Sequence, residues 1–141
     1  MKSLLCHLCI VLIAIGLISF ADIEVYGVDW KFIGDNETFS YFYDTDNITR
    51  SSDGLMRVWS KVIYTDQGVM DYVKDYGEEY KDLIYSLKRF EINCVEKNYR
   101  PLSMINYSKE KVIDSVNFNK SEWDIFIPES IGESLYKEVC E

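Results

Sequence analysis

The sequence predicts a single α+β domain built on a mostly antiparallel sheet. Three observations lead to this fold class. Several segments between residues 30 and 118 alternate in hydrophobicity with a period of two, two other segments have the period of a helix, and the chain contains no internal repeat or proline-rich linker. Strands are therefore expected to dominate, with one helical insertion in mid-chain and one helix at the C-terminus.

Residues 1–21 have the composition of a secretory signal peptide. Lys2 is the single charge, an apolar run covers residues 8–18, and Ser19-Phe20-Ala21 supplies small residues at positions −3 and −1. Cleavage after Ala21 would export a single domain of residues 22–141 with no stable membrane span. An uncleaved membrane anchor is the alternative, because the apolar stretch is about long enough to cross a bilayer.

Loss of the leader changes the charge and the set of possible chemistries. The net charge moves from −9 to −10 when Lys2 is removed, and loss of His7 leaves no histidine. This excludes Ser-His-Asp and Cys-His catalysis and every His-ligated metal site. The acidic balance also argues against nucleic acid as a partner, because such binding needs clustered Lys and Arg. No other residue pattern indicates a catalytic centre, so we expect no enzyme, no cofactor and no metal.

The first half of the domain contains three main strand patterns and the helical insertion. The predicted strands are residues 30–33, 38–44 and 55–64, separated by turn clusters at 34–36, 44–47 and 51–54. An apolar stripe then follows the cap candidate Asp66 at helical spacing. This stripe consists of Val69, Val73, Tyr76 and Tyr80. Gly77 is expected to break the helix before a second helical turn that would contain Leu83, Ile84 and Leu87.

The second half returns to the strand period and ends in a helix. From about Lys88, side chains alternate again, and residues 100–107 and 111–118 form two more predicted strands around the turn 108–110. Ser130 and Glu133 then have the spacing of a capping box at a helix start. The apolar stripe of this helix consists of Ile131, Leu135 and Val139, and Cys140 flanks it. Cys140 is therefore expected to face the surface that the helix buries.

Two cysteines, Cys94 and Cys140, remain after the leader is removed. In an exported protein such a pair is expected to form one structural disulfide. The alternative is a reactive or metal-binding pair, which would need further ligands or a Cys-x-x-Cys spacing, and neither is present.

Candidate binding residues come from the aromatic and basic side chains of the strands. Trp59 and Trp123 could form a ligand platform, although packing is the commoner role of such residues. Arg50 and Arg57 could recognise a carboxylate, or pair structurally with an acid of this chain. The full set of candidates is Tyr41, Tyr43, Arg50, Arg57, Trp59 and Trp123.

The chain resembles the surface-adhesin protein E family of bacterial envelope proteins. The resemblance is carried by short motifs in a matching order, namely Trp30, Tyr41-Phe42-Tyr43-Asp44, Ile48, Arg50, Val58-Trp59, Glu91-Ile92-Asn93-Cys94, Arg100-Pro101-Leu102-Ser103, Tyr107, Trp123, Ile127-Pro128-Glu129-Ser130-Ile131-Gly132-Glu133, Leu135 and Val139-Cys140. It implies an antiparallel sheet of about six strands with a PAS-like outline and a C-terminal helix held by a Cys94–Cys140 disulfide. It also implies an exported, adhesin-like protein that contacts host matrix proteins, and it allows a homodimer. The sequence lacks a lipobox, so an unanchored domain would stay in the periplasm or be released.

Three functions remain open at the level of sequence. The first is a non-catalytic envelope module that binds another protein of the envelope or the extracellular matrix. The second is a small-molecule-binding or sensing domain, in which Phe90, Ile92 and Leu135 would line a cavity between helix and sheet. The third is a structural envelope protein without a soluble ligand.

Overall fold

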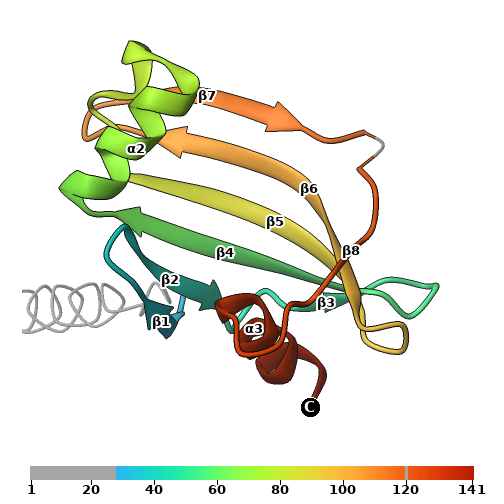
Figure 1. The fold of residues 1–141 in the computed structure, drawn as a ribbon. Coiled ribbons are helices and arrows are strands. Elements are labelled where there is room, and N and C mark those ends of the chain that lie inside the picture. Colours follow the sequence, from blue (N-terminus) through green and yellow to red (C-terminus); the bar gives the residue numbers. More distant parts are fainter. Residues whose placement is uncertain (1–27, 120) are drawn as a thin grey trace, which may run out of the picture.

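A computed structural model describes residues 28–119 and 121–141 of the protein. The predicted leader and its cleavage after Ala21 lie outside these residues. Within these described residues the fold is α+β, with an antiparallel sheet and two α-helices, and it confirms the predicted fold class (Figure 1).

The sheet has the strand order β1-β2-β4-β5-β6-β7, and every neighbouring pair is antiparallel. Two short strands lie off this path, β3 against β4 and β8 against β6. The strands are β1 Trp30–Asp35, β2 Phe39–Asp44, β3 Thr49–Arg50, β4 Met56–Tyr64, β5 Tyr85–Asn93, β6 Asn98–Tyr107, β7 Val112–Asn117 and β8 Asp124–Ile125. The long central strands β4, β5 and β6 therefore form the platform on which the rest is arranged.

Both helices pack on the same face of this sheet, which we call the inner face. Helix α3 (Ile131–Cys140) buries Leu135 and Tyr136 in one cluster with Tyr43, Val58 and Ile92. Helix α2 (Asp66–Tyr76) lies at the other end of the sheet (Figure 1). Its Tyr72 ring contacts the ring of Tyr64, with 5.4 Å between centroids. Side chains alternate between the two faces along a strand, so the strand residues that lie between the inner-face residues point to the opposite, outer face. No helix of the described chain packs on that outer face.

Helix α3 is held to the sheet at several points. The Cys94–Cys140 disulfide joins its last residue to the end of β5, with 5.6 Å between the Cα atoms, and confirms the predicted pairing. The Tyr136 hydroxyl donates to the Cys94 carbonyl oxygen at 3.1 Å. Glu138 accepts from Lys31 at 2.6 Å and from the Tyr43 hydroxyl at 2.8 Å. These two hydrogen bonds hold the pKa of the Glu138 carboxyl below its usual value.

The predicted second helical turn is wrong. Helix α2 ends at Tyr76, and its C-cap is Gly77, whose φ of 119° is a backbone conformation that glycine adopts readily. Only a single 3-10 turn, Glu78–Tyr80, follows. Ile84 already belongs to the sheet through its backbone, because its N–H donates to the Tyr107 carbonyl and its own carbonyl accepts from Tyr64. Leu87 lies inside β5. The sheet hydrogen bonds thus determine that this short apolar run is part of the sheet. Periodicity alone leaves it ambiguous between helix and strand.

Smaller differences concern element ends. The N-cap of α2 is Thr65, one residue before the predicted Asp66, and its hydroxyl accepts from the Gly68 N–H at 3.1 Å. At α3 the predicted N-cap Ser130 is confirmed, accepting from the Glu133 N–H at 3.1 Å. Strand β8 was not predicted, because two residues are too short to show a period.

Gly68 permits a close approach between α2 and the chain before β2. A Cβ at this position would lie 2.0 Å from the Thr38 carbonyl oxygen, which itself accepts the Thr65 N–H at 3.0 Å. We expect Gly68→Ala to lower the free energy of unfolding by about 1–3 kcal/mol, because the helix start must move. Gly132→Ala in α3 is the matched control, since its nearest neighbour would be the Ser130 Oγ at 3.4 Å. Urea unfolding measures both variants, and equal midpoints for the two would contradict the expectation.

Candidate functional site

The outer face of the central strands presents aromatic rings with cations held over them. Lys61 of β4 places its Nζ 4.7 Å from the ring centroid of Tyr85 and 5.7 Å from that of Trp30. The rings of Tyr85 and Tyr107 stack with 4.6 Å between centroids. These side chains are half-buried by one another rather than by a helix. Cation–π pairing of this kind orders both partners at a solvated surface.

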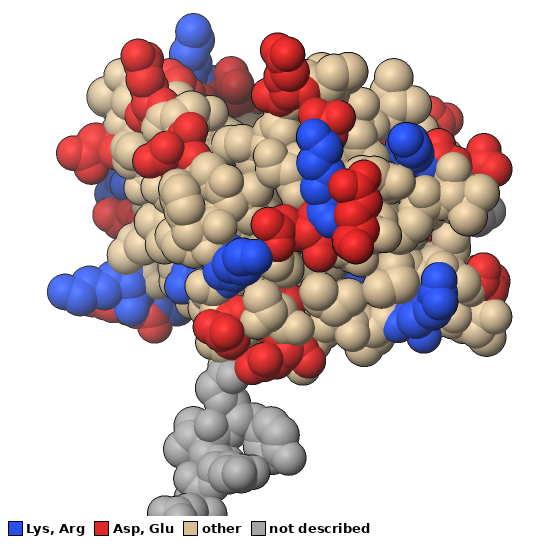
Figure 2. All heavy atoms as spheres, turned by 90° about the horizontal axis from the view of Figure 1, so that it is seen from below, with Lys and Arg blue, Asp and Glu red and all other residues tan. Residues whose placement is uncertain are grey.

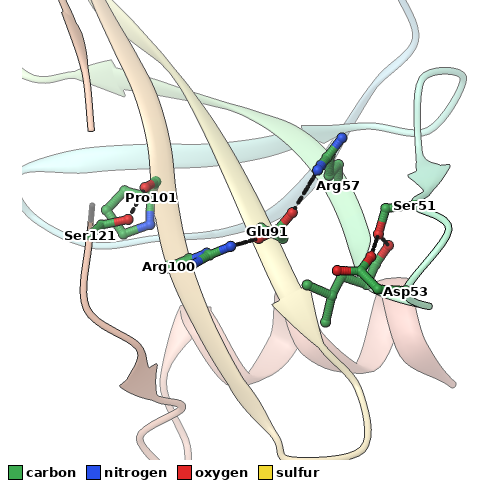
Figure 3. A network of polar contacts seen from close by, with 8 residues as sticks. Ser51, Asp53, Arg57, Glu91, Arg100, Pro101 and Ser121 are labelled. Atoms are coloured by element: carbon green, nitrogen blue, oxygen red, sulfur yellow. Dashed lines mark hydrogen bonds and ion pairs between the residues drawn. The ribbon is translucent and has the colours of Figure 1, made fainter. Parts of the chain in front are cut away.

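A second part of the outer face is an ion-pair cluster around Glu91 (Figure 3). The Glu91 side chain is 2% exposed, and its two oxygens face opposite neighbours. Arg57 Nη2 lies 2.9 Å from Oε1, and Arg100 Nε donates to Oε2 at 2.8 Å. Across the sheet, Arg89 lies over the Trp59 ring at 5.7 Å.

The charge of this face differs from that of the whole chain. On its outer side, the central platform β4–β6 carries the cations Arg57, Lys61, Arg89 and Arg100 and one acid, Glu91. The full chain, in contrast, has a net charge of −9. On the side of the molecule shown in Figure 2, acidic and basic side chains are interspersed without an extended patch of one sign. The outer face is therefore a local cationic and aromatic surface on an acidic protein.

The inner face contains a half-open groove of about 970 Å³ between α3 and the segment 121–126. Its floor is formed by β2, β5 and β6, and its lining is mostly apolar. Phe90, Ile92 and Leu135 are the residues expected to line a cavity in a small-molecule-binding domain. All three border this groove, but Ile92 and Leu135 are 0% and 3% exposed and belong to the core cluster, so only Phe90 presents surface to it. Trp123 lies at the same groove and also contacts Arg100, whose Cζ is 4.6 Å from the Trp123 ring centroid.

Among the described residues that line the groove, Lys88 is the one basic residue. It lies on the inner face of β5, between Ser60 of β4 and Met104 of β6 in the strand register. Desolvation by burial lowers the pKa of its ammonium group, and no carboxylate of the described residues lies within ion-pair distance. Nearby, the Tyr41 hydroxyl donates to Ser60 Oγ at 3.0 Å, and burial raises the pKa of Tyr41 to about 12.

Under α2 the inner face holds a polar network that is internally satisfied. Ser86 Oγ donates to Asn106 Oδ1, and Asn106 Nδ2 donates to Asp114 at 2.7 Å and to the Tyr72 hydroxyl at 3.3 Å. The Tyr80 hydroxyl donates to the other oxygen of Asp114 at 3.0 Å. Because its buried groups have partners, this network is a structural support for α2.

The candidate binding residues separate between the two faces. Arg57 and Trp59 lie on the outer face, and Trp123 joins them indirectly through Arg100. Tyr41 and Tyr43 belong to the inner face, in or against the core cluster. Arg50 is exposed on β3, opposite Met56. The expected structural pairing is found for Arg57 with Glu91; Arg50 has no ion pair among the described residues.

Several further residues of these sites were not among the six candidates from the sequence, including Lys61, Tyr85, Lys88, Arg89 and Arg100. Tyr85 was hidden because the predicted second helical turn overlapped the start of β5. Lys61 shares a face of the predicted strand 55–64 with Trp59 by alternation, and Arg89 is the β5 residue opposite Trp59 in the register. Nothing in the sequence shows that Lys88 is desolvated, because this depends on α3 and the segment 121–126.

Two general searches restrict the chemistry. Within the described ranges, no group of three or more His, Cys, Asp or Glu side chains could hold a metal ion. No helix of residues 28–119 or 121–141 is long and apolar enough to cross a membrane.

The fold and its disulfide define a clamped α+β domain of the kind found outside the cytoplasm. Residues 30–141 match the family model described as surface-adhesin protein E. The chain belongs to the surface-adhesin protein E family, which confirms the resemblance seen in its motifs. Membership in this family makes it an adhesin-like exported or cell-surface protein and implies a non-enzymatic role.

A comparison with solved structures also found a match. Crystal form II of Haemophilus influenzae protein E shares 11% identity with this chain at a TM-score of 0.47, covering 77% of this chain and 91% of that one. No curated protein sequence matches the chain.

Proposed function

We propose that this protein is a non-catalytic binding module that engages a protein partner through the outer face of its sheet. The observation that carries the proposal is the open surface where Lys61 and Arg89 lie over aromatic rings. Tyr, Trp and Arg are enriched where binding energy concentrates in protein interfaces. The ring contacts already order the two cations, so less side-chain entropy is lost on binding.

The charge of the face indicates what kind of partner fits. Four cations against one acid attract an acidic polypeptide segment, while the acidic remainder of the chain repels it elsewhere. We therefore propose an acidic segment of an extracellular matrix or envelope protein as the partner. A second copy of this chain is the alternative occupant. Cleavage after Ala21 would deliver residues 22–141 to the periplasm or the outside of the cell, where such a partner is available.

The test reverses charge on the outer face. The protein is expressed with its own leader, purified as processed by the cell, and titrated against a panel of extracellular matrix proteins by biolayer interferometry. We expect at least one acidic panel protein to bind the wild type, and the variant K61E/R89E to bind it at least tenfold more weakly. The loss should shrink at high salt, because the attraction is electrostatic.

The control variant is K74E/K109E, which makes the same change in net charge on exposed positions away from the outer face. It should bind like the wild type. Equal weakening in both variants would show that only net charge matters, and binding by neither the wild type nor the control would remove the proposed function. Concentration-dependent self-association that K61E/R89E abolishes would assign the face to a homodimer instead.

The groove on the inner face favours a second candidate function. A volume of about 970 Å³ lies near the upper end of the 300–1,000 Å³ common for small-ligand pockets. A small-molecule-binding role at this groove is independent of protein binding at the outer face, because the sheet separates the two sites.

A further inference from the structure

The groove combines an apolar lining with one desolvated cation, and this combination restricts its ligand. Phe90 follows Lys88 on the same face of β5, and the half-buried rings of Tyr99 and Phe126 continue the apolar lining beyond it. A charged group removed from water is costly unless an opposite charge compensates it. The four ion pairs of the described chain do not involve Lys88.

The position of Lys88 leaves its ammonium group available to a bound molecule. Its backbone is fully used by the sheet between β4 and β6, so the side chain alone is free to contact a ligand. Its strand neighbours on the inner face, Ser60 and Met104, carry no charge that could compete for it. The acidic residues of the groove, Glu122 and Asp124, are exposed and form no ion pair with it.

We propose that this groove binds a single-chain amphiphile with a carboxylate head group, such as a fatty acid. The carboxylate pairs with the Lys88 ammonium group, and the hydrocarbon chain lies over the half-buried rings of Phe90, Tyr99 and Phe126. The inference rests on the second candidate function, the groove as a ligand site, and is independent of the outer face. It names the chemical class of the ligand.

The dimensions of the groove agree with a chain of medium length. Beyond Lys88, the centroids of the Phe90 and Tyr99 rings are 5.7 Å apart, and that of Phe126 lies 4.8 Å from Tyr99, so three rings follow one another along the apolar floor. A hydrocarbon chain gains free energy from each methylene that it buries on this floor. A carboxylate beside an ammonium group in a poorly hydrated site gains a charge-assisted hydrogen bond that is stronger than one in water.

The experiment compares two ligands that differ only in the head group. The protein, expressed as the full chain and purified as processed by the cell, is delipidated and titrated below the critical micelle concentration with dodecanoate and with dodecanol. Quenching of tryptophan fluorescence, to which Trp123 at the groove contributes, and the change in Tm report binding. We expect dodecanoate to bind at least tenfold more tightly than dodecanol and to raise Tm.

The decisive variant is Lys88→Met, which keeps an unbranched apolar side chain in the groove. We expect it to weaken dodecanoate at least tenfold and to leave dodecanol unchanged. It should also raise Tm without ligand, because it removes a desolvated charge, so a failure to fold is not expected. Lys74→Met is the matched control, at an exposed position of α2 outside the groove lining, and should bind both ligands like the wild type.

Four results would overturn the proposal in different ways. Equal dodecanoate affinity in wild type and Lys88→Met would remove Lys88 as the head-group partner. Equal affinity of the wild type for dodecanol and dodecanoate would show that the groove binds apolar chains without a preference for a carboxylate. Binding of neither ligand would contradict the groove as a ligand site altogether. Preference for dodecyl phosphate over dodecanoate would assign a phosphate head group instead.

Discussion

Replacement of both cysteines, in the variant C94A/C140A, is expected to lower the free energy of unfolding by about 2–4 kcal/mol. The disulfide joins residues 46 apart in sequence and so restricts a long segment of the unfolded chain, the strands β6, β7 and β8 included. Its loss should leave the sheet formed, because the strand pairing does not depend on it. Urea unfolding of the oxidised wild type and the variant measures the difference.

The same variant should loosen α3 before the rest of the domain. Without the disulfide, the end of α3 keeps the Tyr136 hydroxyl bond to Cys94 and the contacts of Glu138 with Lys31 and Tyr43. Hydrogen exchange in α3 should therefore increase more than in β4 and β5. Val95→Ala is the control, because Val95 adjoins the disulfide but is 86% exposed and should leave stability unchanged. A loss below about 1 kcal/mol in C94A/C140A would contradict the role of this cross-link as the clamp of the fold.

The sequence predicts this fold well where local signals are strong. Ser130 and Glu133 mark the start of α3 because a hydroxyl cap leaves a fixed three-residue spacing. Strand β4 is predicted almost to the residue, since its nine residues repeat the two-residue period several times. The disulfide follows from the count of cysteines once the predicted leader is set aside, because the two that remain have a single possible intramolecular pair.

The prediction is wrong where long-range contacts decide the structure. Residues 83–87 contain a short apolar run that fits a helix or a strand, and hydrogen bonds from β4 and β6 make Ile84 and Leu87 part of the sheet. Strand β8 exists only because β6 offers a partner for it. The environments of Lys88 and Lys61 could not be predicted from the sequence for the same reason. One lysine is desolvated and the other stacked on tyrosine because of segments far away in sequence.

The double variant R57M/R100M is expected to lower the free energy of unfolding by about 3 kcal/mol. Both substitutions keep long apolar stems in the sheet but leave the Glu91 carboxylate, which is 2% exposed, without a cation. In the wild type, Arg57 and Arg100 each approach a different oxygen of this carboxylate (Figure 3). The estimate is at the lower end of the range for a broken buried pair, because the two guanidinium groups are themselves partly exposed. Urea unfolding at neutral pH measures the loss.

The compensating variant distinguishes a buried charge from lost packing. Adding Glu91→Leu to the double variant removes the uncompensated carboxylate and should recover more than half of the lost stability, since hydrophobic replacement of a whole buried ion-pair cluster is often neutral. A triple variant no more stable than the double variant would show that the arginine stems, not their charges, stabilise this part of the sheet. A double variant as stable as the wild type would show that water reaches Glu91.

Because Glu91 lies on the outer face beside Arg89 and Trp59, recovery in the triple variant would also separate the stability of this surface from its binding. The triple variant would keep the fold and both Lys61 and Arg89, so a partner held mainly by those two cations should still bind it.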